Sequence, residues 1–135
     1  MTAEGLIVRR SGFPPRETMD RLATAVAGHG MSVLARIDHA AAAAEVGLAL
    51  VPAEVLVFGN AKAGTPLMQA LPTVAIDLPL KALVWQDEAG VTWLAYNDPA
   101  WLAARHGSID GLKAGLGRMA DVLAAVARQA ADPVP

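Results

Sequence analysis

The spacing of hydrophobic and polar residues changes repeatedly along the chain, and each change predicts a new secondary-structure element. Met19, Leu22 and Val26 recur at i, i+3 and i+7 with polar residues between them, the spacing of an amphipathic helix. Residues 31–39 instead alternate apolar and polar with the two-residue period of a half-buried strand. For the first half of the chain these patterns predict a strand at 5–11, a helix that starts at Pro14-Pro15 and is ended by Gly28-His29-Gly30, a strand at 31–39, a helix at 40–46 and a strand at 54–58.

Turn and capping residues define the elements of the second half. Residues 87–90 form a polar link between two apolar runs, which is the clearest hairpin signal in the chain. Asp98-Pro99 pairs an N-cap with proline at the first helical position, and Ser108 or Asp110 can cap the last helix. The expected elements are a helix at 65–71, strands at 80–86 and 91–96, a helix at 99–105 and a last helix at about 109–131, with 73–78 unassigned.

These elements predict a single α+β domain over residues 1–135. Early alternation of strands and helices is typical of parallel crossovers, whereas the later hairpin requires an antiparallel pair. A two-layer sandwich, with a mixed or mainly antiparallel sheet and helices packed on one face, satisfies both patterns. The 54% hydrophobic content is ample for the core of such a domain.

Composition excludes several classes of function. The chain has no cysteine, which rules out disulfides, thiolate nucleophiles and zinc–thiolate or iron–sulfur sites. A net charge of −2, with 11 basic and 13 acidic residues, provides no positive field for nucleic acid. Glu45, Pro52 and Glu54 interrupt the apolar region at 40–58 short of the ~20 residues that a membrane span needs. We therefore expect a cytoplasmic protein with neither nucleic-acid nor membrane partners.

Polar residues that secondary structure does not require gather at element ends, where binding and catalytic side chains concentrate. His39 lies on the apolar phase of its strand, which fits either a proton carrier or a buried histidine bonded to main chain. His106 follows a helix C-terminus, where the dipole favours a charged imidazole. If Val91, Trp93 and Ala95 face the core, alternation carries Asn97 to the same face, where it needs a buried hydrogen-bond partner.

Lys81 and Asn60 complete the ligand-binding candidates, which are His39, Asn60, Lys81, Asn97 and His106. Lys81 has Asp77 just upstream and shares a face with apolar residues. This fits a buried nucleophile or base, or a lysine whose stem packs while its ammonium reaches water. No cofactor is evident. A divalent metal would use ligands from the set His39, His106, Asp77 and Asp98, although their separation matches no recognised ligand spacing.

Aromatic residues are concentrated in one segment of the chain. All three tryptophans and the only tyrosine lie between Trp85 and Trp101. This concentration fits a ligand pocket, a homodimer patch or packing beneath helices.

Six short motifs occur in an order that resembles the family called domain of unknown function 302. They read IDHAAAA from Ile37, VFGN from Val57, GTPLM from Gly64, DLPLK from Asp77, YNDP from Tyr96 and RHG from Arg105. The likeness covers about residues 5–107. It implies a compact α+β domain with a curved antiparallel sheet, similar to the TATA-binding-protein arrangement and often paired as dimers. It implies no mechanism, and Ala61 stands where the family tends to have proline.

Three functional hypotheses follow from these residues. The first is a non-enzymatic binding module that acts as a homodimer, with a small-molecule or metal-ion site near Asn60, Asn97, His106 and His39. The alternative is a small lyase, isomerase or hydrolase in which a histidine is the general base and Lys81 or Asn97 polarises the substrate. A structural dimerisation module that uses the aromatic segment is a further alternative.

Overall fold

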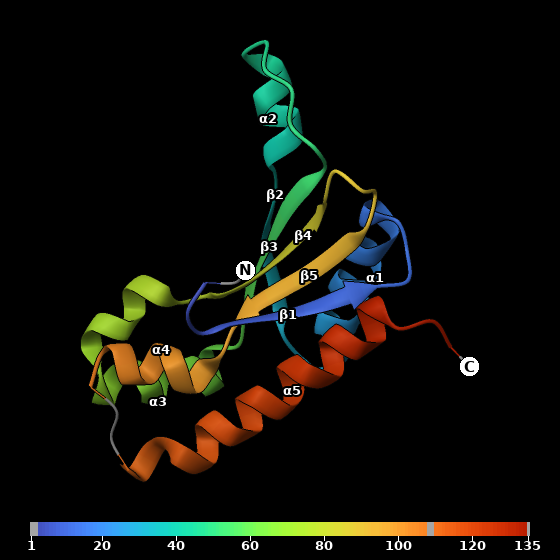
Figure 1. The fold of residues 1–135 in the computed structure, drawn as a ribbon. Coiled ribbons are helices and arrows are strands. Elements are labelled where there is room, and N and C mark those ends of the chain that lie inside the picture. The colour runs from blue at the N-terminus through green and yellow to red at the C-terminus, as the bar shows by residue number, and fades with distance from the viewer. Residues whose placement is uncertain (1–2, 108–109, 135) are drawn as a thin grey trace.

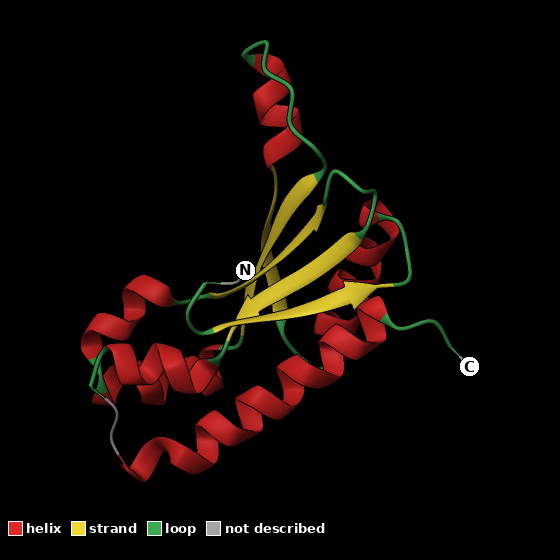
Figure 2. Cartoon of the chain, viewed as in Figure 1, coloured by secondary structure: helices red, strands yellow, loops and turns green. Residues whose placement is uncertain are grey.

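The computed structural model describes residues 3–107 and 110–134 and has a single five-stranded sheet in that part of the chain (Figures 1 and 2). Neighbouring strands are antiparallel throughout this sheet. The predicted α+β sandwich is confirmed, and its sheet is antiparallel rather than mixed. In sheet order the strands are β1 (Leu6–Ser11), β5 (Thr92–Asn97), β4 (Leu80–Gln86), β3 (Ala53–Gly59) and β2 (Ser32–Asp38).

Two helices, α1 (Pro15–Gly28) and α5 (Lys113–Ala131), form a layer on one face of the sheet, and the other helices lie beyond its ends (Figure 1). The others are α2 (His39–Glu45), α3 (Ala61–Ala70) and α4 (Pro99–Arg105), with 3₁₀ helices η1 (Pro72–Asp77) and η2 (Asp110–Leu112). α1 and α5 pack against each other and against the sheet. α3, α4 and the start of α5 lie beyond one end of the sheet, whereas α2 projects from the opposite end (Figure 1). No helix in the described residues is long and apolar enough to cross a membrane.

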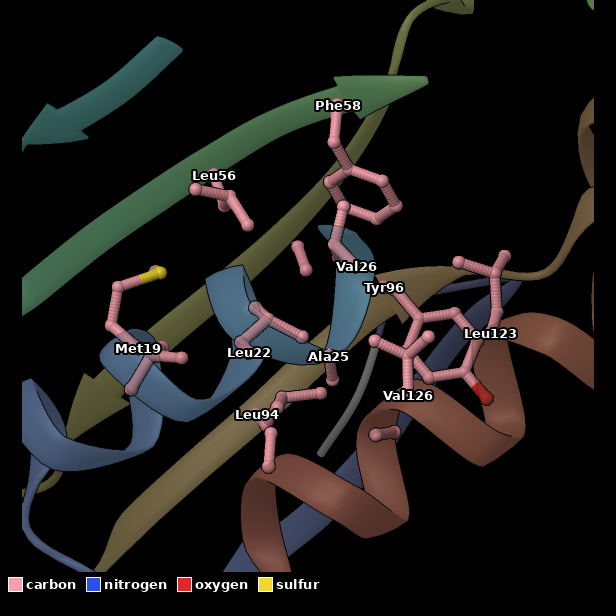
Figure 3. Close-up of a cluster of buried hydrophobic side chains, with 14 of the residues drawn as sticks. Met19, Leu22, Ala25, Val26, Leu56, Phe58, Leu94, Tyr96, Leu123 and Val126 are labelled. Atoms are coloured by element: carbon pink, nitrogen blue, oxygen red, sulfur yellow. The ribbon is translucent and has the colours of Figure 1, made fainter. Parts of the chain in front are cut away.

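The main hydrophobic core lies between α1, α5 and the sheet face that they cover (Figure 3). The apolar stripe that predicted α1 is the surface it buries, and fully burying one such side chain contributes about 1.5–3 kcal/mol. The largest members of this core include Met19, Leu22, Val26, Leu56, Phe58, Leu94, Tyr96, Leu123 and Val126. A second cluster joins α3, η1, α4 and α5 beyond the end of the sheet and contains Leu67, Leu71, Val74, Ala103 and Leu116.

The end of β2 differs from the sequence prediction. A register shift between Val33 and Ala35 breaks the alternation on which the longer strand was based. The strand then ends at Asp38, whose carboxylate accepts a hydrogen bond from the Ala41 amide at 2.9 Å and caps α2. His39 is therefore the first residue of an exposed helix, and its expected place on the apolar side of a strand was wrong.

Other differences concern where helices begin. α3 starts at Ala61, earlier than Thr65-Pro66 suggested, because the Asn60 side chain caps it; Pro66 lies inside the helix. The unassigned segment forms η1, which a cis Leu78–Pro79 peptide bond follows. Asp110 lies in η2 and does not cap α5, which has no side-chain cap. The alternative cap, Ser108, lies outside the described residues.

Candidate functional site

The antiparallel order of the sheet decides which candidate residues share an end of the molecule. β3 and β5 run in the same direction, so Asn60 and Asn97 come at the same end of the sheet, where β4 begins beside Lys81. His106 closes α4, which follows Asn97 almost at once. β2 runs the opposite way, so His39 lies at the far end, on the projecting helix α2 (Figure 1). The structure therefore separates His39 from the other four candidates.

Lys81 and Asn97 lie on the sheet face opposite α1 and α5. The register pairs Ala82 with Tyr96, so one residue further along it sets Lys81 opposite Asn97. Asn97 shares this face with Trp93, as its phase predicted. The helices cover the other face, where Leu94 and Tyr96 lie in the core, so the condition under which Asn97 would face the core is not met. Asn97 is half-buried and Lys81 is exposed, so Lys81 is not a buried nucleophile.

Asn60 and Asp98 both act as helix caps. The Asn60 side-chain oxygen accepts a hydrogen bond from the Lys62 amide at 2.8 Å, and its Nδ2 donates to the Gly30 carbonyl at 3.4 Å. Asp98 accepts from the Ala100 amide at 3.1 Å. These bonds satisfy backbone donors that a helix start otherwise leaves unpaired. The capping role that the Asp98-Pro99 pair suggested is the one that Asp98 has.

A polar cluster joins η1 to the C-terminal end of α4. His106 Nε2 lies 2.5 Å from Asp77 Oδ2, and His106 Nδ1 lies 2.8 Å from the Thr73 hydroxyl. Arg105 donates to the same carboxylate at 2.8 Å. The hydrogen bond from His106, followed by that from Arg105, holds the pKa of Asp77 below its ordinary value of 3.8. Asp77 thus pairs with His106 and Arg105, whereas the sequence had suggested Lys81.

The four candidate metal ligands, His39, His106, Asp77 and Asp98, do not come together in one place. Across the described ranges 3–107 and 110–134, no three His, Asp or Glu side chains lie close enough to hold an ion together. His106 and Asp77 are in contact, but Asp98 caps α4 and His39 lies at the far end of the sheet.

An apolar cavity of about 980 Å³ lies among α3, the first half of α5 and the adjacent ends of β2, β3 and β4. Three methionines, several leucines and five glycines make up most of its wall. The principal lining residues are Met31, Met68, Met119, Leu67, Leu78, Leu116 and Leu123 with Gly30, Gly59, Gly64, Gly111 and Gly115. Among the five predicted ligand-binding residues, Asn60 lines this cavity, and His39, Lys81, Asn97 and His106 do not.

The sequence contained two signals for the residues that were missed. Met31, Met68 and Met119 are three of the five methionines, and flexible thioether side chains are common at adaptable binding surfaces. Gly111 and Gly115 weaken a helix but leave room beside it. Thr73 gave no signal, because it lies in the segment whose structure the sequence pattern did not predict.

The fold and the cavity together define a two-layer α+β domain with an apolar site beyond one end of its sheet. Residues 7–126 match the family described as Domain of unknown function DUF302, and this match covers most of the chain. The chain therefore belongs to the DUF302 family, as the six motifs implied.

A solved relative has the same fold. The crystal structure of an uncharacterized conserved DUF302 protein from Bacillus stearothermophilus matches with a TM-score of 0.84, covering 95% of this chain and 99% of that chain at 22% sequence identity. At this identity the likeness establishes the fold alone.

Longer relatives share a higher identity over part of their length. Proteins named fluoride-specific ion channel FluC 1, from Brucella suis biovar 1 and Brucella abortus biovar 1, are each 48% identical to this chain over 102 residues, or 76% of the chain. The match covers 40% and 38% of those proteins, so the chain spans about two-fifths of their length.

Proposed function

We propose that this domain is a non-enzymatic binding module that holds a small apolar molecule in the cavity between α3 and α5. The observation that carries the proposal is the cavity itself, at about 980 Å³ and lined mainly by apolar side chains. Small-molecule sites have volumes of roughly 300–1,000 Å³ and are mostly apolar with few polar groups.

The lining provides enough apolar surface for useful affinity. A ligand that removes about 200 Å² of apolar surface from water gains roughly 5 kcal/mol before the cost of lost freedom is subtracted. Methionine side chains can change rotamer to fit ligands of different shape, so we expect affinity for a class of molecules.

Titration with the neutral fluorescent probe N-phenyl-1-naphthylamine tests this proposal. We expect saturable binding to the wild type and at least tenfold weaker binding to Gly64→Leu. A Cβ on Gly64 would lie at ordinary contact distance, 3.7 Å, from Leu78 Cδ1, so the backbone accepts the change and the rest of the leucine occupies the cavity. Gly117→Leu is the matched control, because Gly117 also lies in a helix but does not line the cavity. Equal affinity of both variants and wild type would contradict the site.

Self-association through the open face of the sheet is the second part of the proposal. Figure 1 draws no helix over the sheet face opposite α1 and α5 among the described residues. Trp85 and Trp93 stack on that face with ring centroids 6.5 Å apart, and Leu83, two residues before Trp85, lies on the same face between its partners Val55 and Ala95. Aromatic residues are enriched where protein surfaces associate, and large exposed apolar patches mark such interfaces. We propose that two copies pair through this face as a homodimer.

An enzyme with His106 as general base is the second candidate function, and the polar cluster at η1 and α4 favours it. With Asp77 ionised, His106 donates its Nε2 proton to the carboxylate, which leaves Nδ1 to accept the Thr73 hydroxyl. A base oriented by a carboxylate and bonded to a hydroxyl is the arrangement that activates an oxygen nucleophile.

Hydrolysis of p-nitrophenyl acetate tests this second candidate. We expect turnover that is lost in both Thr73→Val and His106→Gln and retained in Thr65→Val, which removes an exposed hydroxyl outside the cluster. Circular dichroism checks that each variant is folded. Wild-type turnover no faster than buffer, or turnover unchanged in Thr73→Val, would contradict this role for the cluster.

A further inference from the structure

The charged residues that line the cavity are all basic. Lys62 comes from the first turn of α3 and Arg118 from the first half of α5, and no aspartate or glutamate is among the lining residues. The chain as a whole has more acidic than basic residues, 13 against 11. The charged side chains of the cavity wall are therefore positive, whereas the net charge of the whole chain is −2.

These two cations have no partner among the described residues. Neither Lys62 nor Arg118 forms a side-chain hydrogen bond or ion pair there, whereas Arg9, Arg36 and Arg105 each pair with a carboxylate. Arg118 folds back along α5, with Nη2 3.7 Å from the position that a Cβ on Gly115 would occupy. Since Gly115 also lines the cavity, the guanidinium lies beside the cavity wall.

Three backbone amides in the first turn of α3 already have hydrogen-bond acceptors within the chain. The Lys62 amide donates to the Asn60 side chain, and the Ala63 and Gly64 amides donate to the Asn60 carbonyl at 3.1 and 2.9 Å. The positive end of the helix dipole adds to the local potential without offering these donors. The charged side chains Lys62 and Arg118 are therefore the groups that we expect to select the ligand's head group.

We propose that the ligand is an amphipathic anion, a hydrocarbon chain that ends in a carboxylate. This inference rests on the proposed function of the cavity and adds the charge of its ligand. In this proposal the hydrocarbon lies among Met31, Met68 and Met119 and the carboxylate binds the basic lining residues Lys62 and Arg118, since all five residues line the cavity. A guanidinium matches the two oxygens of a carboxylate with two parallel hydrogen bonds, and an ammonium adds a second positive charge.

Isothermal titration with three ten-carbon probes tests the inference: decanoate, decanol and decylammonium. We expect decanoate to bind about tenfold more tightly than decanol, because two partly exposed ion pairs contribute modestly, and decylammonium to bind most weakly. Added salt should narrow the gap between decanoate and decanol, since it screens exposed charges. In the double variant Lys62→Gln, Arg118→Gln the advantage of decanoate should disappear while decanol binding is retained.

A charge-matched control separates the local effect from net charge. The double variant Arg16→Gln, Arg128→Gln removes the same total charge at exposed positions outside the cavity, and decanoate should keep its advantage there. Equal affinity of the wild type for decanoate and decanol would overturn the anion inference and leave the apolar site standing. Failure of all three probes to bind would overturn both.

Discussion

The Asp77 carboxylate accepts hydrogen bonds from Arg105 and His106. These bonds connect η1 to the C-terminal end of α4. Arg105 is about half exposed, with 53% of its side-chain surface accessible, and an exposed ion pair contributes at most about 1 kcal/mol. The His106 side chain is only 9% exposed, so its bond to Asp77 is shielded from water. The cluster therefore has a structural role whether or not it also performs chemistry.

Acid should weaken the bonds that Asp77 forms with His106 and Arg105, because protonation removes the negative charge of the carboxylate. The pKa of Asp77 is lower in the folded state than its ordinary value of 3.8, so the unfolded chain binds the proton more tightly. The stabilisation is complete above that ordinary value and is lost as pH falls through the lowered pKa. We expect the free energy of unfolding in urea to fall more steeply from pH 6 to pH 3 in the wild type than in Asp77→Asn. Asp87 and Asp132 also have lowered pKa values but are present in both proteins. Identical acid sensitivity would contradict the role of Asp77.

Alanine substitutions at Gly5 and Gly47 separate the cost of backbone strain, which both share, from the cost of a steric clash, which only Gly5 has. Both have positive φ, at 74° and 76°, so alanine at either position costs about 1 kcal/mol in backbone strain. A Cβ on Gly5 would also lie 2.2 Å from Trp101 Cδ2, whereas nothing lies within 4 Å at Gly47. We expect Gly5→Ala to destabilise by about 2–4 kcal/mol and Gly47→Ala by about 1 kcal/mol, measured by urea unfolding. Equal losses would mean that Trp101 does not pack on Gly5.

Sequence reasoning at the residue scale was most successful where the cause is local. Asp98 before proline predicted a cap because the bond it makes spans two residues. The partner of Asp77 could not be predicted in this way, since Arg105 and His106 approach it only after α4 has packed against η1. The role of Thr73 could not be predicted for the same reason, since its hydrogen bond to His106 joins residues that are 33 positions apart in sequence.

At the scale of elements, α5 combines a buried stripe with glycines in its exposed first turns. Gly117 has no neighbour within 4 Å of its would-be Cβ, and its φ is not positive. Gly117→Ala should therefore stabilise the protein by about 0.5–1 kcal/mol through helix propensity alone. Urea unfolding measures the gain. No gain, or a loss, would show that the start of α5 is not helical in solution.

The periodic elements were predicted well because their signal is contained in one segment. The stripes of α1 and α5 and the hairpin of β4 and β5 each follow from spacing within about twenty residues. The strand predicted at 31–39 is present as β2, but the place of His39 was wrong, because the strand ends at Asp38 and a register shift changes which residues face inward. The helix predicted at 65–71 begins four residues earlier, at Ala61, because Asn60 caps it and Pro66 lies inside it.

At the scale of the whole molecule, the open face of the sheet leads to a prediction about assembly. We expect a dimer by size-exclusion chromatography with light scattering, and a monomer for Leu83→Glu, because Leu83 lies on that face and a buried charge without a partner is costly. Ile76→Glu is the control: Ile76 is 74% exposed on η1, away from the sheet, and its variant should remain dimeric. A monomeric wild type at high concentration would contradict the proposed homodimer.

The cavity is a property of the whole molecule that no local pattern contains. Its walls come from α3 and α5, which are more than forty residues apart in sequence. Periodicity predicts that each helix has an apolar side, but it does not predict whether two such sides meet closely or leave a space. The candidate centre predicted from element ends was built on polar residues, and of these only Asn60 lines the cavity.

Methionine-methyl NMR tests most directly whether this cavity binds an apolar chain. With ¹³C-methyl methionine, addition of decanoate should shift the signals of Met31, Met68 and Met119 together along one saturable curve. Met19 lies fully buried in the main core, outside the cavity, and its signal should stay in place. Cavity methyls that do not move at saturating decanoate, or a Met19 signal that moves as far as theirs, would contradict the account.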